Sequence, residues 1–135
     1  MLKTRYLYHG TVADQMPSIL RAGLHAPSFW GSRRMAEHWA QRRGKYADGI
    51  VLIRRKLSEF ASEHLFWDEL MEEESVWFEY QVEDDKRAAC KQAQGYWEES
   101  LRILESVIYD LPVKVRAAEV INVKQHDQTV ENLAI

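Results

Sequence analysis

The chain has 135 residues, of which 46% are hydrophobic and 11% aromatic, and its formal net charge at pH 7 is −3. This length suits one domain, spanning residues 1–135, and the apolar and aromatic content excludes a disordered chain. The longest apolar runs are too short to cross a bilayer, and the first residues lack the hydrophobic segment of a signal peptide. Cys90 is the single cysteine, which excludes an intramolecular disulfide and a cysteine-based metal site. We therefore expect a soluble cytoplasmic protein with no membrane partner.

Charge is distributed unevenly along the chain. Residues 1–58 contain eleven Lys or Arg against three Asp or Glu, whereas residues 59–99 contain three Lys or Arg against thirteen Asp or Glu. A basic first part suits a ligand that carries phosphate. The two parts could equally complement each other within the folded molecule, and the two interpretations are compatible.

The first part of the chain alternates short strands and helices. We expect a strand over 5–9, a helix over 14–22 capped by Asp14 and ended by Gly23, and a short strand over 28–30. Ser32 is the expected N-cap of a helix over 33–43. The β-branched run over 49–57 is the clearest strand of the sequence.

The second part is harder to interpret. Apolar residues from Phe60 to Met71 recur at helical spacing, 75–82 alternates like a strand, and a long helix is expected to open at Asp84 or Asp85 and end near Leu104. Strands are expected over 106–109 and at 113–115 and 119–123. This order predicts an α+β fold and not a doubly wound parallel sheet. Neither GxGxxG nor GxxxxGK[ST] occurs, which excludes the common glycine-rich phosphate loops.

The sequence Tyr8-His9-Gly10-Thr11, followed after one helix length by Gly23-Leu24, places an imidazole and a glycine at a strand end. Together with Glu105-Ser106-Val107-Ile108-Tyr109-Asp110, it resembles the ADP-ribosyltransferase superfamily, nearest to its diphtheria-toxin and poly(ADP-ribose)-polymerase branch. The resemblance implies split mixed or antiparallel sheets flanked by helices, with residues 58–97 as an acidic helical insertion. The size suggests a small stand-alone member, of the kind found among toxins and effectors.

The resemblance also implies a set of NAD-binding residues. His9 would hydrogen-bond the adenosine ribose, the backbone of Gly10 would pair with the nicotinamide carboxamide, and Thr11 would add a hydrogen bond. Polymerase-like members stack a tyrosine on nicotinamide, and Phe29-Trp30 stands at that place here, so stacking would survive without the hydroxyl. The sequence leaves open which of Phe29 and Trp30 faces the pocket, because a one-residue slip reverses the face. Ser32 is a further NAD-binding candidate, although the helix cap is its simpler role.

Glu105 is the catalytic residue that the resemblance implies, with His9 as its companion. Its carboxylate would hold the nicotinamide-ribose 2′-hydroxyl and stabilise the positive charge that grows as nicotinamide leaves. The alternative is an exposed glutamate at a helix–strand junction, with Glu98, Glu99 and Asp110 as other carboxylates. The arginines at 33, 34, 42 and 43, with Lys45, could meet a pyrophosphate or an acidic partner, but a solvated helix face is the simpler interpretation.

We therefore expect an NAD-dependent mono-ADP-ribosyltransferase that modifies a protein or nucleic-acid acceptor and needs no metal, since no metal-ligand spacing is present. Three alternatives remain open. These are an NAD glycohydrolase, an RNA 2′-phosphotransferase-like enzyme on the same fold, and a non-catalytic binding or inhibitor module that uses the acidic segment 59–99.

Overall fold

The two seven-residue strands, β1 (Tyr6–Val12) and β3 (Ile50–Lys56), pair antiparallel along their whole length. In the computed structural model, which describes residues 5–43, 49–68 and 97–123, they form the middle of a six-stranded sheet. The other strands are β2 (Ser28–Gly31), β4 (Leu65–Trp67), β5 (Ser106–Tyr109) and β6 (Val120–Val123). The strand order is β4-β5-β2-β1-β3-β6, and every ladder among these strands is antiparallel. The fold is therefore α+β, as expected, but the described strands form one antiparallel sheet and not the split sheets that the resemblance implies.

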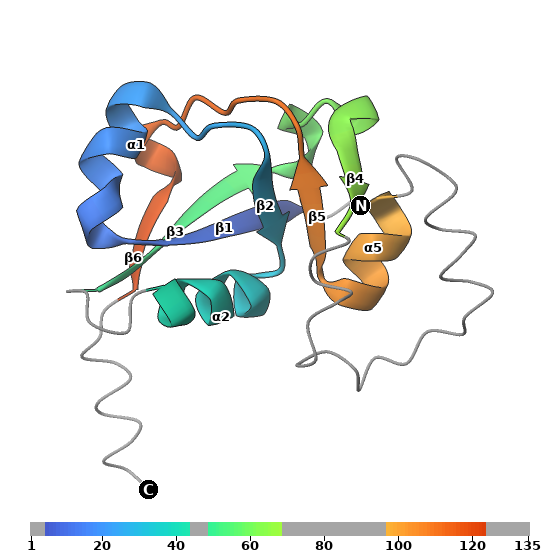
Figure 1. The fold of residues 1–135 in the computed structure, drawn as a ribbon, viewed down its shortest axis with the longest axis horizontal. Helices are drawn as coiled ribbons and strands as arrows, with labels where there is room; N and C mark the ends of the chain where they lie inside the picture. Colours follow the sequence, from blue (N-terminus) through green and yellow to red (C-terminus); the bar gives the residue numbers. More distant parts are fainter. Residues whose placement is uncertain (1–4, 44–48, 69–96, 124–135) are drawn as a thin grey trace, which may run out of the picture.

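Three α-helices flank the described part of the sheet: α1 (Met16–Ala22), α2 (Arg33–Arg43) and α5 (Trp97–Leu104). Ser32 caps α2 as predicted, because its Oγ accepts a hydrogen bond from the Met35 N–H at 3.1 Å. Gly23, with φ of 80°, ends α1 as predicted. Figure 1 shows β2 and β5 running crosswise to β1 and β3, with α2 below their junction and α5 beside β5.

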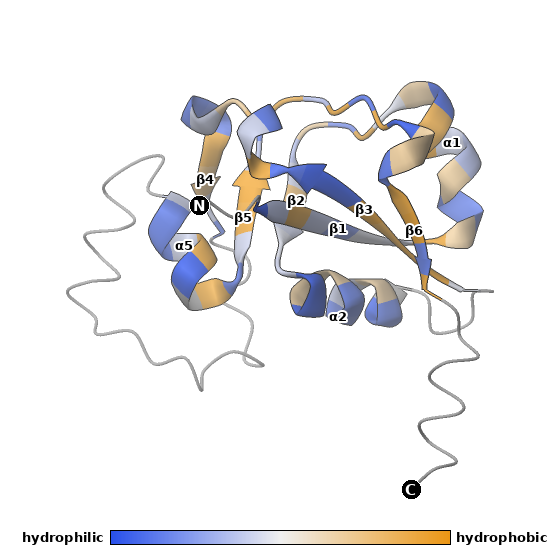
Figure 2. Cartoon of the chain, turned by 180° about the vertical axis from the view of Figure 1, so that it is seen from behind, coloured by the Kyte–Doolittle hydropathy of each residue, from blue (hydrophilic) through white to orange (hydrophobic). Residues whose placement is uncertain are grey.

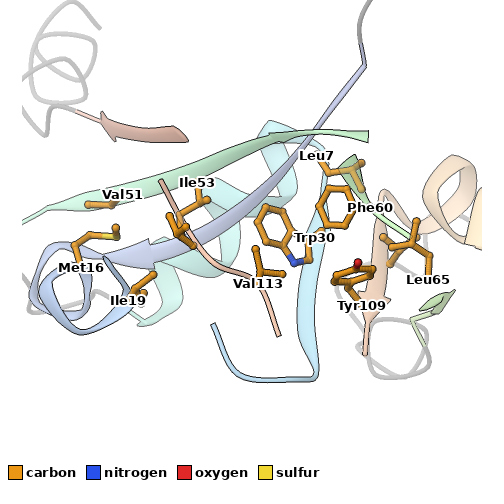
Figure 3. Close-up of a cluster of buried hydrophobic side chains, with 12 residues drawn as sticks. Leu7, Met16, Ile19, Trp30, Val51, Ile53, Phe60, Leu65, Tyr109 and Val113 are labelled. Atoms are coloured by element: carbon orange, nitrogen blue, oxygen red, sulfur yellow. The ribbon is translucent and has the colours of Figure 1, made fainter. Parts of the chain in front are cut away.

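Strand alternation divides the sheet into two faces. One face, which we call the core face, carries Leu7, Trp30, Ile53 and Val107, and α1 covers part of it with Met16 and Ile19. The labelled side chains of Figure 3 are part of this apolar cluster. Burial of such side chains stabilises the fold by roughly 1.5–3 kcal/mol each.

The opposite face, which we call the helix face, carries Gly10, Gly31 and Ser106. A Cβ added at Gly10 would lie 1.9 Å from the Ala36 carbonyl oxygen, so α2 packs directly on this face. Ser100 of α5 donates a hydrogen bond to the Ser106 carbonyl at 2.6 Å, which places α5 beside the same strands. Both helices present hydrophilic stretches in the view from behind (Figure 2).

Several expectations about local structure are corrected. The first strand continues past Gly10 to Val12. Asp14 lies inside a short 3-10 turn, Ala13–Gln15, and is not the cap of α1, which follows with Pro17 in its first turn. Val113 forms an isolated bridge with Leu24 where a strand over 113–115 was expected.

The largest correction concerns residues 58–68. Helical spacing predicted a helix from Phe60, but the chain forms two 3-10 turns, Leu57–Glu59 and Ser62–His64, and then strand β4. All three residues of β4 pair with β5, so these residues add an edge strand to the sheet where a helical segment was expected. The last part of the helix expected to end near Leu104 is α5, which runs from Trp97 to Leu104. The strand expected over 75–82 and the start of that helix at Asp84 or Asp85 lie outside the described residues.

Candidate active site

The sheet is weakest between β1 and β2. Their ladder has a single residue pair, Tyr8–Gly31, whereas β1 pairs with β3 through seven. The Arg5 carbonyl and the Ala13 N–H both bond to the β3 side, at 2.9 and 3.2 Å. Because alternate residues of a strand point their backbone groups to opposite sides, the N–H and C=O of Gly10 point toward β2. They do so beyond the Tyr8–Gly31 pair, where the ladder has ended.

His9 lies at this point but on the core face. Its side chain is 7% exposed, and Nδ1 lies 2.8 Å from the Phe29 carbonyl oxygen. A carbonyl only accepts, so Nδ1 carries the proton of the imidazole. The His9 ring also packs on Trp30, with 5.5 Å between ring centroids. His9 therefore links β1 to β2 where their backbone pairing stops.

The strand register separates the two aromatic candidates. Trp30 points to the core face, is 1% exposed, and donates from Nε1 to the Ser28 Oγ at 2.8 Å. It also packs edge-on against Phe60. Phe29 points to the helix face and is half-buried. Phe29 is therefore the better candidate for stacking on a ligand, and Trp30 is a core residue.

Glu105 has an unusual backbone conformation. Its φ is 58°, and it is the first residue after α5, with its N–H donating to the Leu101 carbonyl at 3.1 Å. Helices commonly end in this left-handed conformation with glycine or asparagine, because a Cβ there costs roughly 1–2 kcal/mol. A glutamate at this position breaks the local preference, which is typical of functional sites.

The Glu105 carboxylate is held at the N-terminus of α2. The Ser32 hydroxyl donates to Oε1 at 3.0 Å, and the Arg34 guanidinium forms an ion pair with both carboxylate oxygens. The Glu105 carbonyl also accepts from the Ser32 N–H at 3.0 Å. Glu105 is 23% exposed in its side chain, and Arg34 is 60% exposed. The predicted helix–strand junction is confirmed, with two side-chain partners that the sequence did not indicate.

Helix α2 sets the separation between Gly10 and Glu105. Gly10 touches the backbone of Ala36, and the Glu105 carboxylate touches Ser32. These two contacts on α2 are four residues apart, which is about 6 Å along a helix axis. Gly10 and Phe29 therefore share the helix face by strand alternation, α2 covers Gly10 on that face, and the Glu105 carboxylate lies at the N-terminus of the same helix.

The other candidates lie elsewhere. Thr11 lies on the core face, as His9 and Trp30 do, and is 3% exposed. Of the other carboxylates, Glu99 pairs with Arg102 and Asp110 pairs with His64. Glu98 is exposed in the first turn of α5. The seven predicted site residues thus divide between two faces, and the imidazole and the carboxylate are not on the same one.

A buried polar network supports the start of β5. Asp68, 2% exposed, accepts from the Ser106 Oγ at 2.6 Å, and its N–H donates to the Ser100 Oγ at 3.0 Å. Ser100 and Ser106 are also fully buried. The network joins the end of β4, α5 and the residue that follows Glu105. Asp68 was not among the predicted site residues, and its signal in the sequence is an acid directly after the apolar Leu65-Phe66-Trp67.

One open depression, of about 540 Å³, lies away from these residues and is lined by Arg55, Glu59, Lys114 and Arg116. Within the described ranges no three His, Cys, Asp or Glu side chains are grouped to hold a metal ion. No helix in that part of the chain is long and apolar enough to cross a membrane.

Comparison with protein-family models, with curated proteins and with solved structures gave no match for this chain.

Proposed function

We propose that this protein is an NAD-dependent mono-ADP-ribosyltransferase of the ADP-ribosyltransferase-like fold. The observation that carries the proposal is the position of the Glu105 carboxylate at the N-terminus of α2, the helix that packs on the face shared by Gly10 and Phe29 beyond the end of the β1–β2 ladder. The three residues come from the two motifs of the resemblance and from the strand between them.

In this proposal the nicotinamide carboxamide pairs with the backbone edge of Gly10. An antiparallel strand neighbour would use the same N–H and C=O, so the amide group of nicotinamide has the complementary donor and acceptor. The half-buried ring of Phe29 packs on the nicotinamide, which requires only a flat apolar face.

Glu105 acts on the reacting bond. Its carboxylate accepts from the 2′-hydroxyl of the nicotinamide ribose and stabilises the positive charge as the bond from C1′ to nicotinamide breaks. The bonding electrons leave with nicotinamide, and an acceptor nucleophile then attacks C1′ and loses its proton. One well-placed electrostatic group of this kind lowers the activation free energy by roughly 3–4 kcal/mol.

His9 has a revised role in this proposal. Its buried position and its bond to the Phe29 carbonyl suit a positioning residue, which holds β2 against β1 where their backbone pairing stops. The ribose contact that the resemblance implies would require the imidazole to leave the core face. We therefore assign no direct contact to His9, Thr11 or Trp30.

The experiment is to incubate the purified protein with NAD labelled in its adenine, with and without cell lysate. Label on a protein or nucleic acid supports transfer, and free ADP-ribose supports hydrolysis with water as the acceptor. Glu105→Gln should lower either activity by about 10²–10³-fold, and Glu98→Gln, an exposed glutamate at the other end of α5, should leave it unchanged. Intact NAD under all conditions would refute the proposal.

A further inference from the structure

Arg34 stands at a position that helix stability does not explain. It lies in the first turn of α2, next to Arg33, and this turn contains no acidic residue. Cations near a helix N-terminus are unfavourable because the helix dipole is positive there. Arg33 is balanced within α2 by Glu37 at 3.0 Å. Arg34 instead pairs across the fold with Glu105, 71 residues away.

The Arg34–Glu105 pair uses the oxygens that the proposed reaction needs. The guanidinium contacts Oε1 and Oε2, and the Ser32 hydroxyl also donates to Oε1. A carboxylate engaged in this way is a weaker acceptor for an incoming ribose hydroxyl. The guanidinium has five N–H donors in a planar fork, and this geometry matches phosphate as well as carboxylate. Because Arg34 is 60% exposed, a ligand at this surface can reach it.

We propose that Arg34 is a substrate-phosphate residue that exchanges partners. It holds Glu105 in the free protein and moves to the pyrophosphate of NAD when the dinucleotide binds, which frees the carboxylate for the ribose. This inference rests on the proposed function and adds a substrate specificity to it. The site would select nicotinamide ribosides that carry phosphate, because only these can draw the guanidinium from Glu105.

The test compares three substrates on the purified full chain: NAD, nicotinamide mononucleotide and nicotinamide riboside, which carry two, one and no phosphate groups. The wild-type protein should cleave NAD with the highest kcat/KM and the riboside with the lowest. Arg34→Ala should lower kcat/KM for NAD by roughly tenfold or more, the value of one lost charged hydrogen bond. For the riboside it should cause no loss, so that the preference between the two substrates largely disappears.

Arg33→Ala is the matched control, since it removes a neighbouring exposed arginine from the same turn. It should leave both the activity and the preference unchanged, and a thermal melt of each variant checks the fold. Arg34→Lys keeps the charge without the planar fork and should restore part of the loss for NAD. An equal loss for NAD and riboside in Arg34→Ala would overturn the exchange, because Arg34 would then only orient Glu105.

A binding measurement separates this inference from the proposed function. Pyrophosphate alone is titrated into wild type and Arg34→Ala by calorimetry, with no reaction required. Binding by wild type that is lost in Arg34→Ala supports the phosphate contact even where no NAD is cleaved, in which case the proposed reaction fails and the anion site stands. Equal pyrophosphate binding by both proteins would overturn the inference, whatever the outcome with NAD.

Discussion

Ser32 and Glu105 lie 73 residues apart in the chain and are joined by a hydrogen bond of 3.0 Å from Oγ to Oε1. The same Oγ accepts from the Met35 N–H and so caps α2. One hydroxyl therefore starts the helix and orients the carboxylate. A single side chain at the end of β2 couples the stability of α2 to the geometry of the candidate site.

Ser32→Ala should affect both functions of this hydroxyl. Loss of an N-cap costs about 0.5–2 kcal/mol of unfolding free energy, and loss of the bond to Glu105 should lower kcat for NAD cleavage. Ser32→Thr keeps the hydroxyl and should stay close to wild type in both measurements. Chemical denaturation measures the stability of the two variants, and the NAD assay measures their activity. A fully active Ser32→Ala variant would contradict the orienting role.

Glu105→Gly should separate stability from activity. Glycine adopts the φ of 58° without the cost of a Cβ, roughly 1–2 kcal/mol, while the ion pair that is lost is partly exposed and contributes about 0–1 kcal/mol. We therefore expect the unfolding free energy to stay the same or rise, and NAD cleavage to be lost. Glu105→Ala lacks the carboxylate but keeps the Cβ, so it should be inactive and less stable than Glu105→Gly. A clear loss of stability in Glu105→Gly would show that the carboxylate is mainly structural.

Phe29 and Trp30 should respond in opposite ways. Trp30→Ala removes a fully buried side chain and should cost roughly 3–5 kcal/mol, as large core truncations do. Phe29→Ala should cost less, because the ring is half-buried, but should raise KM for NAD if the ring packs on nicotinamide. Thermal melts and initial-rate kinetics on both variants test the assignment. A Phe29→Ala variant with unchanged KM would remove Phe29 from the site.

Gly10→Ala tests the packing of α2 on β1. The new Cβ would meet the Ala36 carbonyl at 1.9 Å, and backbone on both sides leaves no flexible group to move. We expect a loss of about 1–3 kcal/mol or more from overpacking. Gly49→Ala is the comparison, since no atom of the described residues outside its chain neighbours lies within 4 Å of its added Cβ, and the cost there comes from its φ of 133° without a packing clash. Similar denaturation midpoints for Gly10→Ala and wild type would mean that α2 lies farther from β1 than described.

Local patterns were sufficient for part of the fold. The β-branched run of β3, the Ser32 cap and the glycine that ends α1 each depend on neighbours in sequence, and all three were predicted. Strand β4 was not predictable in this way. Its three residues are a strand only because β5 lies beside them, and the apolar residues around them repeat at helical spacing.

The candidate site likewise has residues that local sequence predicts and residues that only the tertiary structure places. Gly10 and Glu105 were found from motifs, but which side chains share a face depends on the register between β1, β2 and β5. Strand alternation places Phe29 and Trp30 on opposite faces, and the register decides that Trp30 and His9 are on the core face. The pairing of Arg34 with Glu105 and the role of Asp68 were not predicted, because the partners lie 71 and 38 residues away. Contacts of this length leave no periodic signal in the sequence.

Glu119 gives a prediction for the pH dependence of stability. Burial raises its pKa, but hydrogen bonds from the Arg116 side chain and backbone, and the charges of Arg55 and Arg116, outweigh that effect and hold the pKa below its ordinary value. A carboxyl with a lowered pKa stabilises the folded state above its unfolded pKa, and this contribution is lost as the pH falls through the folded pKa.

Glu119→Gln should therefore be less stable than wild type at neutral pH, by about 1–3 kcal/mol for a buried charged hydrogen bond. The difference should shrink as the pH falls below the ordinary glutamate value of 4.5, since protonated Glu119 resembles glutamine. Denaturation midpoints of both proteins between neutral and acidic pH measure this, with the exposed Glu63→Gln as the control that shows little difference throughout. A gap between wild type and Glu119→Gln that stays constant across the acidic range would mean that packing, and not charge, holds Glu119 in place.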